Sequence, residues 1–487
     1  MHSQSLGADL TLERLRDFAG LACRPEEVRP GSLFFAFEEF LRYNEWVDGK
    51  DWMDAAISAG AGGLVADFFV EQAVGRPEIS RFAVPNPRRA FAAAARLLHG
   101  APDEDLRPVG VTGTNGKSSI VGLIAAVGRR LEGRGGSLGT LGFRVNGEEI
   151  EPMDYTTDLA HENFRRMARF RSEGGGLLAM EVSSHALALD RVHGVHFAQA
   201  VFTNLSQDHL DFHGDMAAYR NAKARLFAEL RPGAKAIINA MDAAADQMVA
   251  GTAATVWRFA ATPAVSADFV ATEVEATARG TAFTVIFRGA RAPVRSALVG
   301  RFQIDNLLAA IAVGCARGHP LEAVAAAVSE GTPPPGRMEA HPLDSGAVGL
   351  VDYAHNPGGL ENLLRTCRDL APRRILLVFG CGGDRDRSKR PLMARIAENG
   401  ADRVWVTSDN PRTEDPEAII DDILAGLREP ARAVREADRA TAIRLAMGEA
   451  REGDLLVVAG KGHETYQIIG TRKFPFSDQD ILSEGRG

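Results

Sequence analysis

Short apolar runs alternate with longer amphipathic stretches through the middle and the end of the chain. The middle part contains the runs GVTG, LLAMEVSS, QAVFTNLS and KAIINA, with the helix-like SSIVGLIAAVGRRLEG after the first. The last part contains GLVDYAH, ILLVFG, RVWVTSD and DLLVVAG. Helical stretches from Gly358, Lys389 and Pro416 separate these runs, and Asp438 is a good N-cap for a fourth, DRATAIRLAMGEA. Strands that alternate with helices form βαβ units, so the pattern predicts α/β domains with mostly parallel sheets.

Two proline-containing segments divide the chain into three predicted domains. Pro102 and Pro108 flank a run of acidic residues, and Pro333-Pro334-Pro335-Gly336 favours an extended linker. The first domain mixes apolar runs such as SLFFAF and GGLVADFF with helical stretches such as DWMDAAISAGA, and no chemical motif is apparent in it. The last two are predicted to be doubly wound. The predicted domains are 1–103, 104–335 and 336–487.

Composition and charge narrow the class of protein. Of 487 residues, 45% are hydrophobic and 25% charged, the balance of a soluble globular protein. The net charge of −8 gives no overall basic field for nucleic acid or anionic lipid. The four cysteines form no C-x-x-C pair, so a disulfide framework or a cysteine zinc site is not supported. With no apolar run of roughly 18 residues and no signal-peptide pattern, we expect a cytoplasmic protein.

The first chemical motif follows the predicted strand at 109–112. Gly113-Thr114-Asn115-Gly116-Lys117-Ser118-Ser119 leads into an apolar helix, the context in which a P-loop binds phosphates. Its backbone N–H groups and the helix N-terminus would face phosphate oxygens, Lys117 would reach the terminal phosphates, and Ser118 would bind Mg²⁺. Val111 stands where the strict pattern has its first glycine. The alternative is an ordinary glycine-rich turn, but the flanking strand and helix favour nucleotide binding.

An acid, two histidines and a lysine follow downstream. Glu181 ends an apolar strand, and a carboxylate at that edge of a parallel sheet can hold Mg²⁺; the alternative is a merely structural carboxylate. His209 and His213 are four residues apart, but no H-E-x-x-H motif is present, and His161-Glu162 lacks the second histidine, so a zinc protease is disfavoured. From spacing alone, Lys223 is predicted to be solvated.

Six motifs stand in a recognisable order along the chain. They are Gly113-Thr114-Asn115-Gly116-Lys117-Ser118, Glu181-Val182-Ser183-Ser184-His185, Asn204-Leu205-Ser206-Gln207-Asp208-His209-Leu210-Asp211, Gly336-Arg337-Met338-Glu339, Asp352-Tyr353-Ala354-His355 and Gly460-Lys461-Gly462-His463-Glu464. Together they resemble the Mur ligase family of peptidoglycan precursor synthesis. The resemblance is strong from about residue 108 to 480 and weak before it. One motif alone would be poor support, but six in family order make coincidence implausible.

The resemblance implies a three-domain α/β enzyme. The N-terminal domain would hold the UDP end of the substrate, the central P-loop ATPase-like parallel sheet would hold ATP, and the C-terminal Rossmann-like domain would bring the incoming amino acid. It implies ATP-dependent amide formation between UDP-N-acetylmuramoyl-L-alanyl-D-glutamate and meso-2,6-diaminopimelate through an acyl phosphate. Because a carboxylate and an amine form a salt at neutral pH, the acid must first be activated. A monomer without nucleic-acid or membrane partners is expected.

The resemblance also implies roles for individual residues. The ATP contacts would be Gly113, Thr114, Asn115, Gly116, Lys117, Ser118, Ser119, Asn306, Arg337 and Asp352. The Mg²⁺ ligands would be Ser118, Glu181, His209 and Lys223, the last as a carbamate, and the catalytic residues Lys117, Glu181, His209 and Lys223. The UDP-substrate contacts would be Thr156, Thr157, Ser183 and Arg191. The amino-acid contacts would be Arg385, Asp409, Asn410, Pro411, Arg412, Gly460 and Glu464.

The segment Asp409-Asn410-Pro411-Arg412 resembles the one that marks family members adding diaminopimelate in place of L-lysine. The physical reason is the distal carboxylate of diaminopimelate, which an arginine can bind bidentately. A plain Asn-Pro turn with a solvated Arg412 is the alternative. Other open functions are the same reaction with L-lysine, folylpolyglutamate synthesis within the family, another P-loop NTPase, and a nucleotide-binding module without activity.

Four features depart from the family pattern. Asp158 replaces a proline, Leu189 a substrate-contacting glutamine, and Gln303 an asparagine. Cys23-Arg24-Pro25 resembles only loosely the Asp-Ser-Arg of the uridine pocket. These departures concern the contacts to the UDP substrate and leave the ATP chemistry unaffected.

Overall fold

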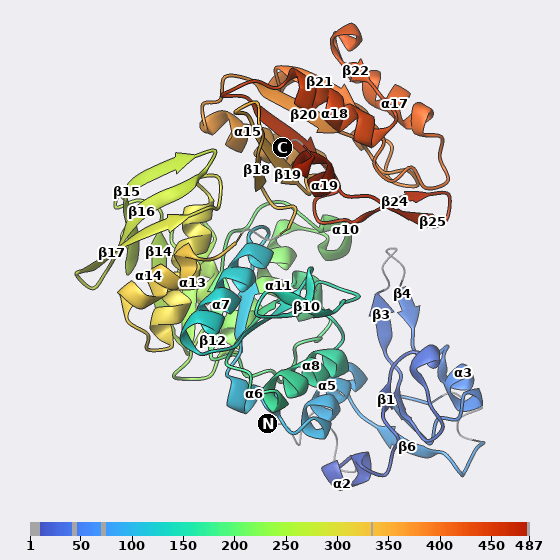
Figure 1. Ribbon diagram of the computed structural model, residues 1–487. Coiled ribbons are helices and arrows are strands. Elements are labelled where there is room, and N and C mark those ends of the chain that lie inside the picture. The colour runs from blue at the N-terminus through green and yellow to red at the C-terminus, as the bar shows by residue number, and fades with distance from the viewer. Residues whose placement is uncertain (1–9, 41–45, 70–74, 333–334, 485–487) are drawn as a thin grey trace. The chain divides into compact units, whose positions relative to one another are not determined.

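The computed structural model describes residues 10–40, 46–69, 75–332 and 335–484 (Figure 1). The chain divides into two compact units. The first comprises Met1–Ala271, Val285–Ala292 and Asp305–Val328, and the second Thr272–Thr284, Pro293–Ile304 and Ser329–Gly487. Pro333 and Pro334, in the predicted linker, lie outside the described residues.

The start of the first unit is a small parallel sheet covered by helices. Its strands lie in the order β1-β2-β5-β6, and α5 packs against α8 of the following part (Figure 1). The apolar runs SLFFAF and GGLVADFF each contain a short strand, β2 and β5, whose residues are buried on both faces of the sheet. The elements are α2 Leu12–Leu15, β1 Leu21–Ala22, η1 Pro25–Glu27, β2 Leu33–Phe35, β3 Glu38–Phe40, β4 Trp46–Asp48, α3 Met53–Ser58, β5 Gly63–Ala66, β6 Ser80–Ala83 and α5 Pro87–Leu98.

The largest sheet has eleven strands in the order β10-β9-β8-β11-β7-β12-β13-β14-β15-β16-β17. Neighbours from β8 to β14 are parallel, as the alternating pattern predicts. The strands are β7 Val109–Thr112, β8 Gly135–Gly139, β9 Gly142–Val145, β10 Glu148–Glu151, β11 Leu177–Glu181, β12 Gln199–Phe202, β13 Lys235–Asn239, β14 Thr255–Ala260, β15 Phe269–Thr277, β16 Gly280–Phe287 and β17 Ala290–Ser296. The helices are α6 Pro102–Leu106, α7 Lys117–Leu131, α8 Ala160–Ser172, α9 Ser184–Ala188, α10 Leu210–His213, α11 Met216–Ala228, α12 Ala245–Val249, α13 Gln303–Ala316 and α14 Leu321–Ser329.

The second unit contains a six-stranded sheet in the order β18-β19-β23-β20-β21-β22 and a separate hairpin, β24-β25. Within the six-stranded sheet, β18 is antiparallel to β19 and all other neighbours are parallel. The strands are β18 Glu339–Pro342, β19 Val348–Asp352, β20 Ile375–Phe379, β21 Arg403–Val406, β22 Val434–Arg435, β23 Leu455–Ala459, β24 Tyr466–Ile469 and β25 Arg472–Pro475. The helices are α15 Pro357–Asp369, α16 Lys389–Gly400, α17 Pro416–Leu424, η2 Pro430–Arg432, α18 Arg439–Glu449 and α19 Asp478–Ser483.

The side chains of β20 show that this second sheet is covered on both faces. Leu377 and Phe379 belong to the core that includes residues of α15, α16 and α17. Leu376 and Val378 belong to the opposite core, with residues of α18 and α19. Successive strand residues point to opposite faces, so helices cover both, which confirms the α/β, doubly wound prediction.

Helix starts follow the local signals in the sequence. α7, α16 and α17 begin close to or at the predicted residues, and α15 begins one residue before Gly358. Asp438 caps α18 as predicted, since its side chain accepts a hydrogen bond from Thr441 N at 2.8 Å. Such a cap satisfies an N–H group that has no partner inside the helix.

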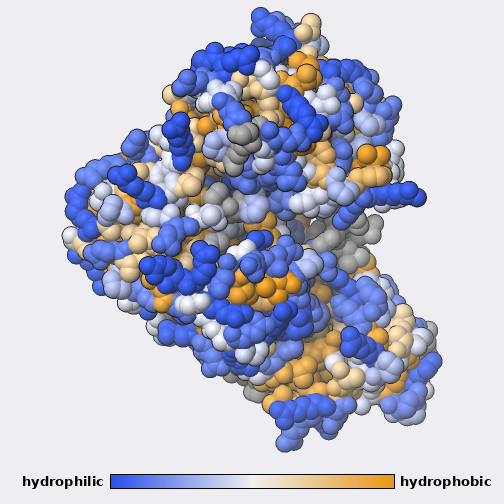
Figure 2. Space-filling view, in the orientation of Figure 1, coloured by the Kyte–Doolittle hydropathy of each residue, from blue (hydrophilic) through white to orange (hydrophobic). Residues whose placement is uncertain are grey.

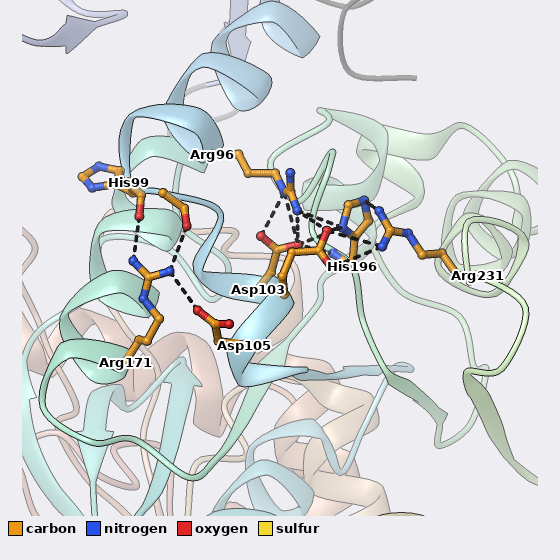
Figure 3. Close-up of polar contacts among 9 residues, drawn as sticks. Arg96, His99, Asp103, Asp105, Arg171, His196 and Arg231 are labelled. Carbon is orange, nitrogen blue, oxygen red and sulfur yellow. Dashed lines mark hydrogen bonds and ion pairs between the residues drawn. The ribbon is translucent and has the colours of Figure 1, made fainter. Parts of the chain in front are cut away.

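The acidic run between the first two predicted domains forms α6. Asp103 is 1% exposed and accepts two bonds from Arg96 Nε and Nη2, at 2.9 and 3.0 Å. His196 lies 2.8 Å from Glu104, and Arg231 contacts both His196 and Glu104 (Figure 3). Two arginines therefore neutralise these carboxylates, and the cluster is an ion-pair network that ties α5 to α6.

On the face in view, Figure 2 shows mostly hydrophilic residues, with several patches of hydrophobic ones between them. Among the described residues, no helix has the length and apolar character needed to cross a membrane.

Candidate active site

The loop between β7 and α7 requires glycine at two positions. Gly113 and Gly116 have φ angles of +149° and +87°, a region that other residues rarely adopt. A Cβ on Gly113 would lie 1.9 Å from Thr203 Oγ1, and one on Gly116 would lie 2.6 Å from Asn306 Oδ1. The loop is thus closely packed against Thr203 and against Asn306, which is a predicted ATP contact.

The segment after β12 holds the shape of this loop. Thr203 Oγ1 donates to Asn115 O at 2.6 Å, and Asn115 N donates to Asn204 Oδ1 at 3.0 Å. Thr114 N donates to Asn204 O at 2.9 Å, and Ser206 N donates to Thr114 Oγ1 at 3.0 Å. Because these bonds fix the backbone, the loop does not have to be ordered by a ligand.

Two lysines meet at one carbonyl of the loop. Lys117 Nζ donates to Gly113 O at 3.1 Å and to Thr114 O at 2.9 Å. Lys223 Nζ donates to Gly113 O at 2.9 Å and lies 4.4 Å from the centre of the Tyr219 ring. Lys223 is 1% exposed, so the expectation from spacing that it is solvated is wrong. Burial, and after it the charge of Lys117, lowers the pKa of the Lys223 ammonium well below its ordinary value.

Glu181 lies beside the loop at the end of β11. Its register partner in β7 is Val111, close to the start of the phosphate loop. The side chain is 1% exposed, and Oε1 accepts from Thr140 N at 2.9 Å. This buried carboxylate has the hard oxygen donors that Mg²⁺ prefers.

His209 does not lie within a helix, as a zinc-binding i, i+4 pair would. It is the N-cap of α10 with a φ of +53°. Its ring centre lies 4.7 Å from that of His185 and 6.2 Å from that of Tyr219. Tyr219 in turn contacts Lys223 and lies 3.1 Å from Thr114 Oγ1, so His209 belongs to the surroundings of the loop.

The four predicted UDP-substrate contacts lie close together, linked by hydrogen bonds that also involve Thr140 and Glu181. Thr157 Oγ1 donates to Glu181 O at 2.8 Å, and Ser183 N donates to Thr157 Oγ1 at 3.0 Å. Arg191 Nη1 donates to Thr157 O at 3.3 Å. Thr156 Oγ1 lies 3.1 Å from the hydroxyl of Thr140, the residue that also holds Glu181. The structure therefore brings these residues together with Glu181.

Tyr155 connects this group to the loosely matching N-terminal segment. Arg191 lies 4.2 Å from the centre of the Tyr155 ring, and Arg24 Nη2 donates to the Tyr155 hydroxyl at 2.9 Å. The three single-residue departures from the family pattern are all buried. Asp158 accepts from Arg166 at 3.0 Å, Leu189 is 4% exposed and Gln303 is 1% exposed.

Two further predicted ATP residues lie in the second unit. Asp352 ends β19 and accepts from Met338 N and Ala354 N, both at 2.9 Å. Burial raises the pKa of the Asp352 carboxyl, while the charge of Arg337 and the two N–H donors oppose this shift. Arg337 lies 4.9 Å from the centre of the Tyr353 ring. The predicted ATP contacts Ser118 and Ser119 lie in the first unit, in the first turn of α7.

The segment Asp409 to Arg412 follows β21 and is held by β24. Ile468 N donates to Asn410 Oδ1 at 2.9 Å, and Arg412 N donates to Ile468 O at 3.0 Å. Asp409 is 8% exposed; burial raises the pKa of its carboxyl, and the charges of Arg439 and Lys461 oppose this. The segment is therefore part of an ordered ladder, and is more than a plain Asn-Pro turn.

Arg412 lies over the loop that follows β20. Its Nη1 donates to Gly383 O at 2.8 Å, and a Cβ on Gly382 would lie 2.9 Å from that nitrogen and 3.8 Å from Arg385 Cγ. A Cβ on Gly383 would lie 1.9 Å from Pro411 O. Two guanidinium side chains, Arg412 and Arg385, thus border the same glycine turn, a suitable place for an anion.

The loop after β23 completes this group. A Cβ on Gly460 would lie 2.6 Å from Asp409 Oδ2, so only glycine allows this approach. Glu464 Oε2 accepts from Asn410 Nδ2 at 2.8 Å and from Lys461 Nζ at 3.1 Å. The predicted amino-acid contacts from three strand ends are therefore neighbours. We call Asp409–Arg412, Arg385, Gly460, Lys461 and Glu464 the amino-acid cradle.

Sequence reasoning missed the residue that braces the cradle from inside. Arg439 and Asp478 form a fully buried ion pair with two bonds of 2.8 Å. Arg439 also donates to Ser408 O at 3.4 Å and Ala459 O at 3.1 Å, the residues that precede Asp409 and Gly460. Its position after the predicted N-cap Asp438 was the only local signal, and this does not reveal a partner 39 residues away.

Comparisons with known proteins agree with this geometry. Residues 111–314 match the model of the Mur ligase middle domain, and residues 336–462 match that of the Mur ligase, glutamate ligase domain. A UDP-N-acetylmuramoyl-L-alanyl-D-glutamate–2,6-diaminopimelate ligase of Geobacillus kaustophilus is 41% identical, with 96% of this chain and 94% of the relative covered. A relative of the same name in Chromobacterium violaceum is 43% identical, with 94% and 92% covered.

A solved structure extends the comparison to three dimensions. A ligase of that name superimposes with a TM-score of 0.70 at 32% identity, with 96% of this chain and 94% of that chain covered. The two domain models together with near-full-length relatives show that the chain belongs to the Mur ligase family.

Proposed function

We propose that this Mur ligase joins meso-2,6-diaminopimelate to UDP-N-acetylmuramoyl-L-alanyl-D-glutamate, with ATP as the activating substrate. The observation that carries the proposal is similarity over nearly the whole chain to ligases named for this reaction. Two sites at strand ends support it. The loop after β7 suits phosphates, and the amino-acid cradle suits an amino acid that carries a distal anion. Residues 1–103 would hold the UDP end, 104–335 ATP, and 336–487 the amino acid. We expect a cytoplasmic monomer without nucleic-acid or membrane partners.

The reaction consists of two transfers. A γ-carboxylate oxygen of D-glutamate attacks the γ-phosphorus of ATP, the bond to ADP breaks, and an acyl phosphate forms. The amine of diaminopimelate then attacks the acyl carbon, phosphate leaves, and the new amide nitrogen loses a proton. Lys117 and the N–H groups of the loop would hold the phosphates in line, which supplies positioning and charge stabilisation.

The residues around the loop fit a magnesium site. Mg²⁺ would neutralise charge on the phosphates when it is bound. Ser118 and Glu181 would hold one ion and His209 would help to hold a second. The buried Glu181 carboxylate supports this assignment, because its oxygens suit a hard cation.

Lys223 would take part as a carbamate. Its amine nitrogen attacks the carbon of CO₂, an N–C bond forms, and the nitrogen loses a proton, which leaves an anionic oxygen ligand. The lowered pKa of Lys223 supports this, because only the neutral amine is nucleophilic. An unmodified ammonium at the same place would repel a metal.

A phosphate-release assay with the UDP-muramoyl-dipeptide and a panel of amino acids tests the proposal. We expect release of phosphate only when the dipeptide substrate and diaminopimelate are both present. ATP hydrolysis that is independent of both would favour another P-loop NTPase. ATP binding without turnover in any combination would favour a binding module, and either result would contradict the proposal.

A further inference from the structure

Lys461 is a buried cation that joins two residues predicted to contact the incoming amino acid. Its side chain is 0% exposed, and Nζ donates to Asn410 Oδ1 and to Glu464 Oε2, both at 3.1 Å. Asn410 Nδ2 donates to the same Glu464 oxygen at 2.8 Å. Three side chains from two strand-end loops therefore form a closed triangle.

The triangle fixes the orientation of the Asn410 amide. Its oxygen accepts from Lys461 Nζ and from Ile468 N at 2.9 Å, and both of these groups are donors only. The amide nitrogen must then point to Glu464. Asn410 is thus oriented by its neighbours, and its oxygen is already occupied within the protein.

The anchoring bonds of Glu464 reach only one of its two oxygens. Lys461 and Asn410 both donate to Oε2. Within the described part of the chain, no side-chain or backbone group donates to Oε1. A carboxylate accepts hydrogen bonds at both oxygens. Oε1 therefore remains available to a cationic ligand group, and the side chain that presents it is 18% exposed.

We propose that Lys461 is a positioning residue that determines how the enzyme recognises the distal ammonium of diaminopimelate. It anchors Oε2 of Glu464, so that Oε1 meets that ammonium. The inference rests on the proposed function and refines it, because it separates recognition of the distal ammonium from recognition of the distal carboxylate at Arg412. Lys461 itself does not contact the substrate.

The test uses Lys461→Met in the full-length enzyme, a change that keeps the length and apolar stem but removes the donor. The KM for meso-diaminopimelate should rise roughly tenfold, the effect of losing a hydrogen bond to a charged group. The KM for ATP should not change. A second substrate, 2-aminopimelate, keeps the reacting amine and the distal carboxylate but lacks the distal ammonium, and its KM should be the same in variant and wild type.

Matched variants separate positioning from general damage. Lys473→Met removes another lysine that lies over the Tyr466 ring, 4.2 Å from its centre, but outside the triangle, and should leave both KM values unchanged. In a Glu464→Gln background, Lys461→Met should raise the KM for diaminopimelate much less than it does in the wild type. If Lys461→Met does not fold, Lys461→Arg replaces it. A KM that is raised for diaminopimelate and unchanged for 2-aminopimelate would then support the positioning role.

Equal changes with both substrates, or no change with either, in a variant that melts like the wild type would overturn the positioning role. The wild-type assay reports separately on the proposed function. Turnover of diaminopimelate by the wild type, with Lys461→Met unaffected, refutes only the inference. A wild type that is inactive with every amino acid refutes the proposed function and the inference together.

Discussion

The phosphate loop of the first unit is shaped by backbone, whereas the amino-acid cradle of the second is shaped by side chains. In the loop, Gly113 and Gly116 permit the turn, and Thr203 and Asn204 bond mainly to main-chain atoms. In the cradle, buried side chains bond to one another, as Lys461 does with Asn410 and Glu464.

The difference fits what each site is proposed to recognise. Every nucleotide offers the same phosphate oxygens, so N–H groups at a helix N-terminus are sufficient. Amino acids differ in the charges at their distal end, and only charged side chains at defined places can distinguish them. Glycine substitutions should therefore damage the loop, and single truncations should change selectivity in the cradle.

Gly113→Ala should produce the largest effect. The new Cβ would lie 1.9 Å from Thr203 Oγ1 at a φ of +149°, so clash and backbone strain add together. ATP affinity should fall roughly 10²–10³-fold, measured by titration calorimetry. Gly122→Ala is the matched control, because a Cβ there meets nothing within 4 Å, and it should stabilise the protein by about 0.5–1 kcal/mol. Normal ATP binding by Gly113→Ala would refute the backbone account of the loop.

Lys223→Ala should lower kcat by roughly 10²-fold while ATP still binds, because the variant lacks the anionic ligand that a carbamate provides. Lys235→Ala, which removes the lysine over the Trp257 ring, should have wild-type turnover. With ¹³CO₂, a carbamate signal is expected in the wild type and not in Lys223→Ala. A fully active Lys223→Ala enzyme, or an active wild type without the signal, would contradict the carbamate.

Arg412→Ala should collapse the preference for meso-diaminopimelate over L-lysine. Loss of a partner for a buried charge costs about 2–5 kcal/mol, enough for a selectivity change of roughly 30-fold or more. The ratio of kcat/KM for the two amino acids is the measurement. Arg472→Ala, on the exposed strand β25, removes the same charge from the surface and should leave the ratio intact. An unchanged ratio in Arg412→Ala would assign the selectivity to other residues.

Asp305→Asn should have the smallest effect, on stability alone. Burial raises the pKa of the Asp305 carboxyl from 3.8 to about 6, and its Oδ1 has no hydrogen-bond partner among the residues that the structure describes. The folded state therefore binds this proton more tightly than the unfolded state, so stability decreases as the pH rises from about 4 to about 6.

The asparagine should remove that pH dependence and stabilise the protein by about 1–2 kcal/mol at pH 7.5. Below pH 4 the difference between variant and wild type should shrink, because the protonated carboxyl resembles the amide. Denaturant unfolding of variant and wild type at pH 7.5 and below pH 4 tests this. If the two proteins differ in free energy of unfolding by the same amount at both pH values, the charge of Asp305 does not cause the difference.

Features made by consecutive residues could be predicted from the sequence. The apolar runs of the parallel sheets, the N-cap Asp438 and the glycine turn before α7 depend on near neighbours in the chain. Strands β15 to β17 lack this signal, because their more buried residues alternate with half-buried or exposed ones and form no continuous apolar run. Their pairing partners had to come from the structure.

Features made by distant residues could not be predicted from spacing. Lys223 lies in a helical stretch where a lysine is ordinarily solvated, yet its contact is with Gly113, 110 residues earlier. Lys461 and Asn410 are 51 residues apart, and the Arg439–Asp478 pair joins two helices. Resemblance to the family supplied a role for Lys223, but it supplied none for Lys461 or Arg439.

A competition experiment tests the central claim most directly. The wild-type enzyme, ATP, Mg²⁺ and UDP-N-acetylmuramoyl-L-alanyl-D-glutamate are incubated with equal concentrations of meso-diaminopimelate and L-lysine, and the products are separated by mass. The account predicts that the diaminopimelate product strongly predominates and that ADP forms in equal amount to total product. Equal amounts of the two products, or ADP without either, would contradict it.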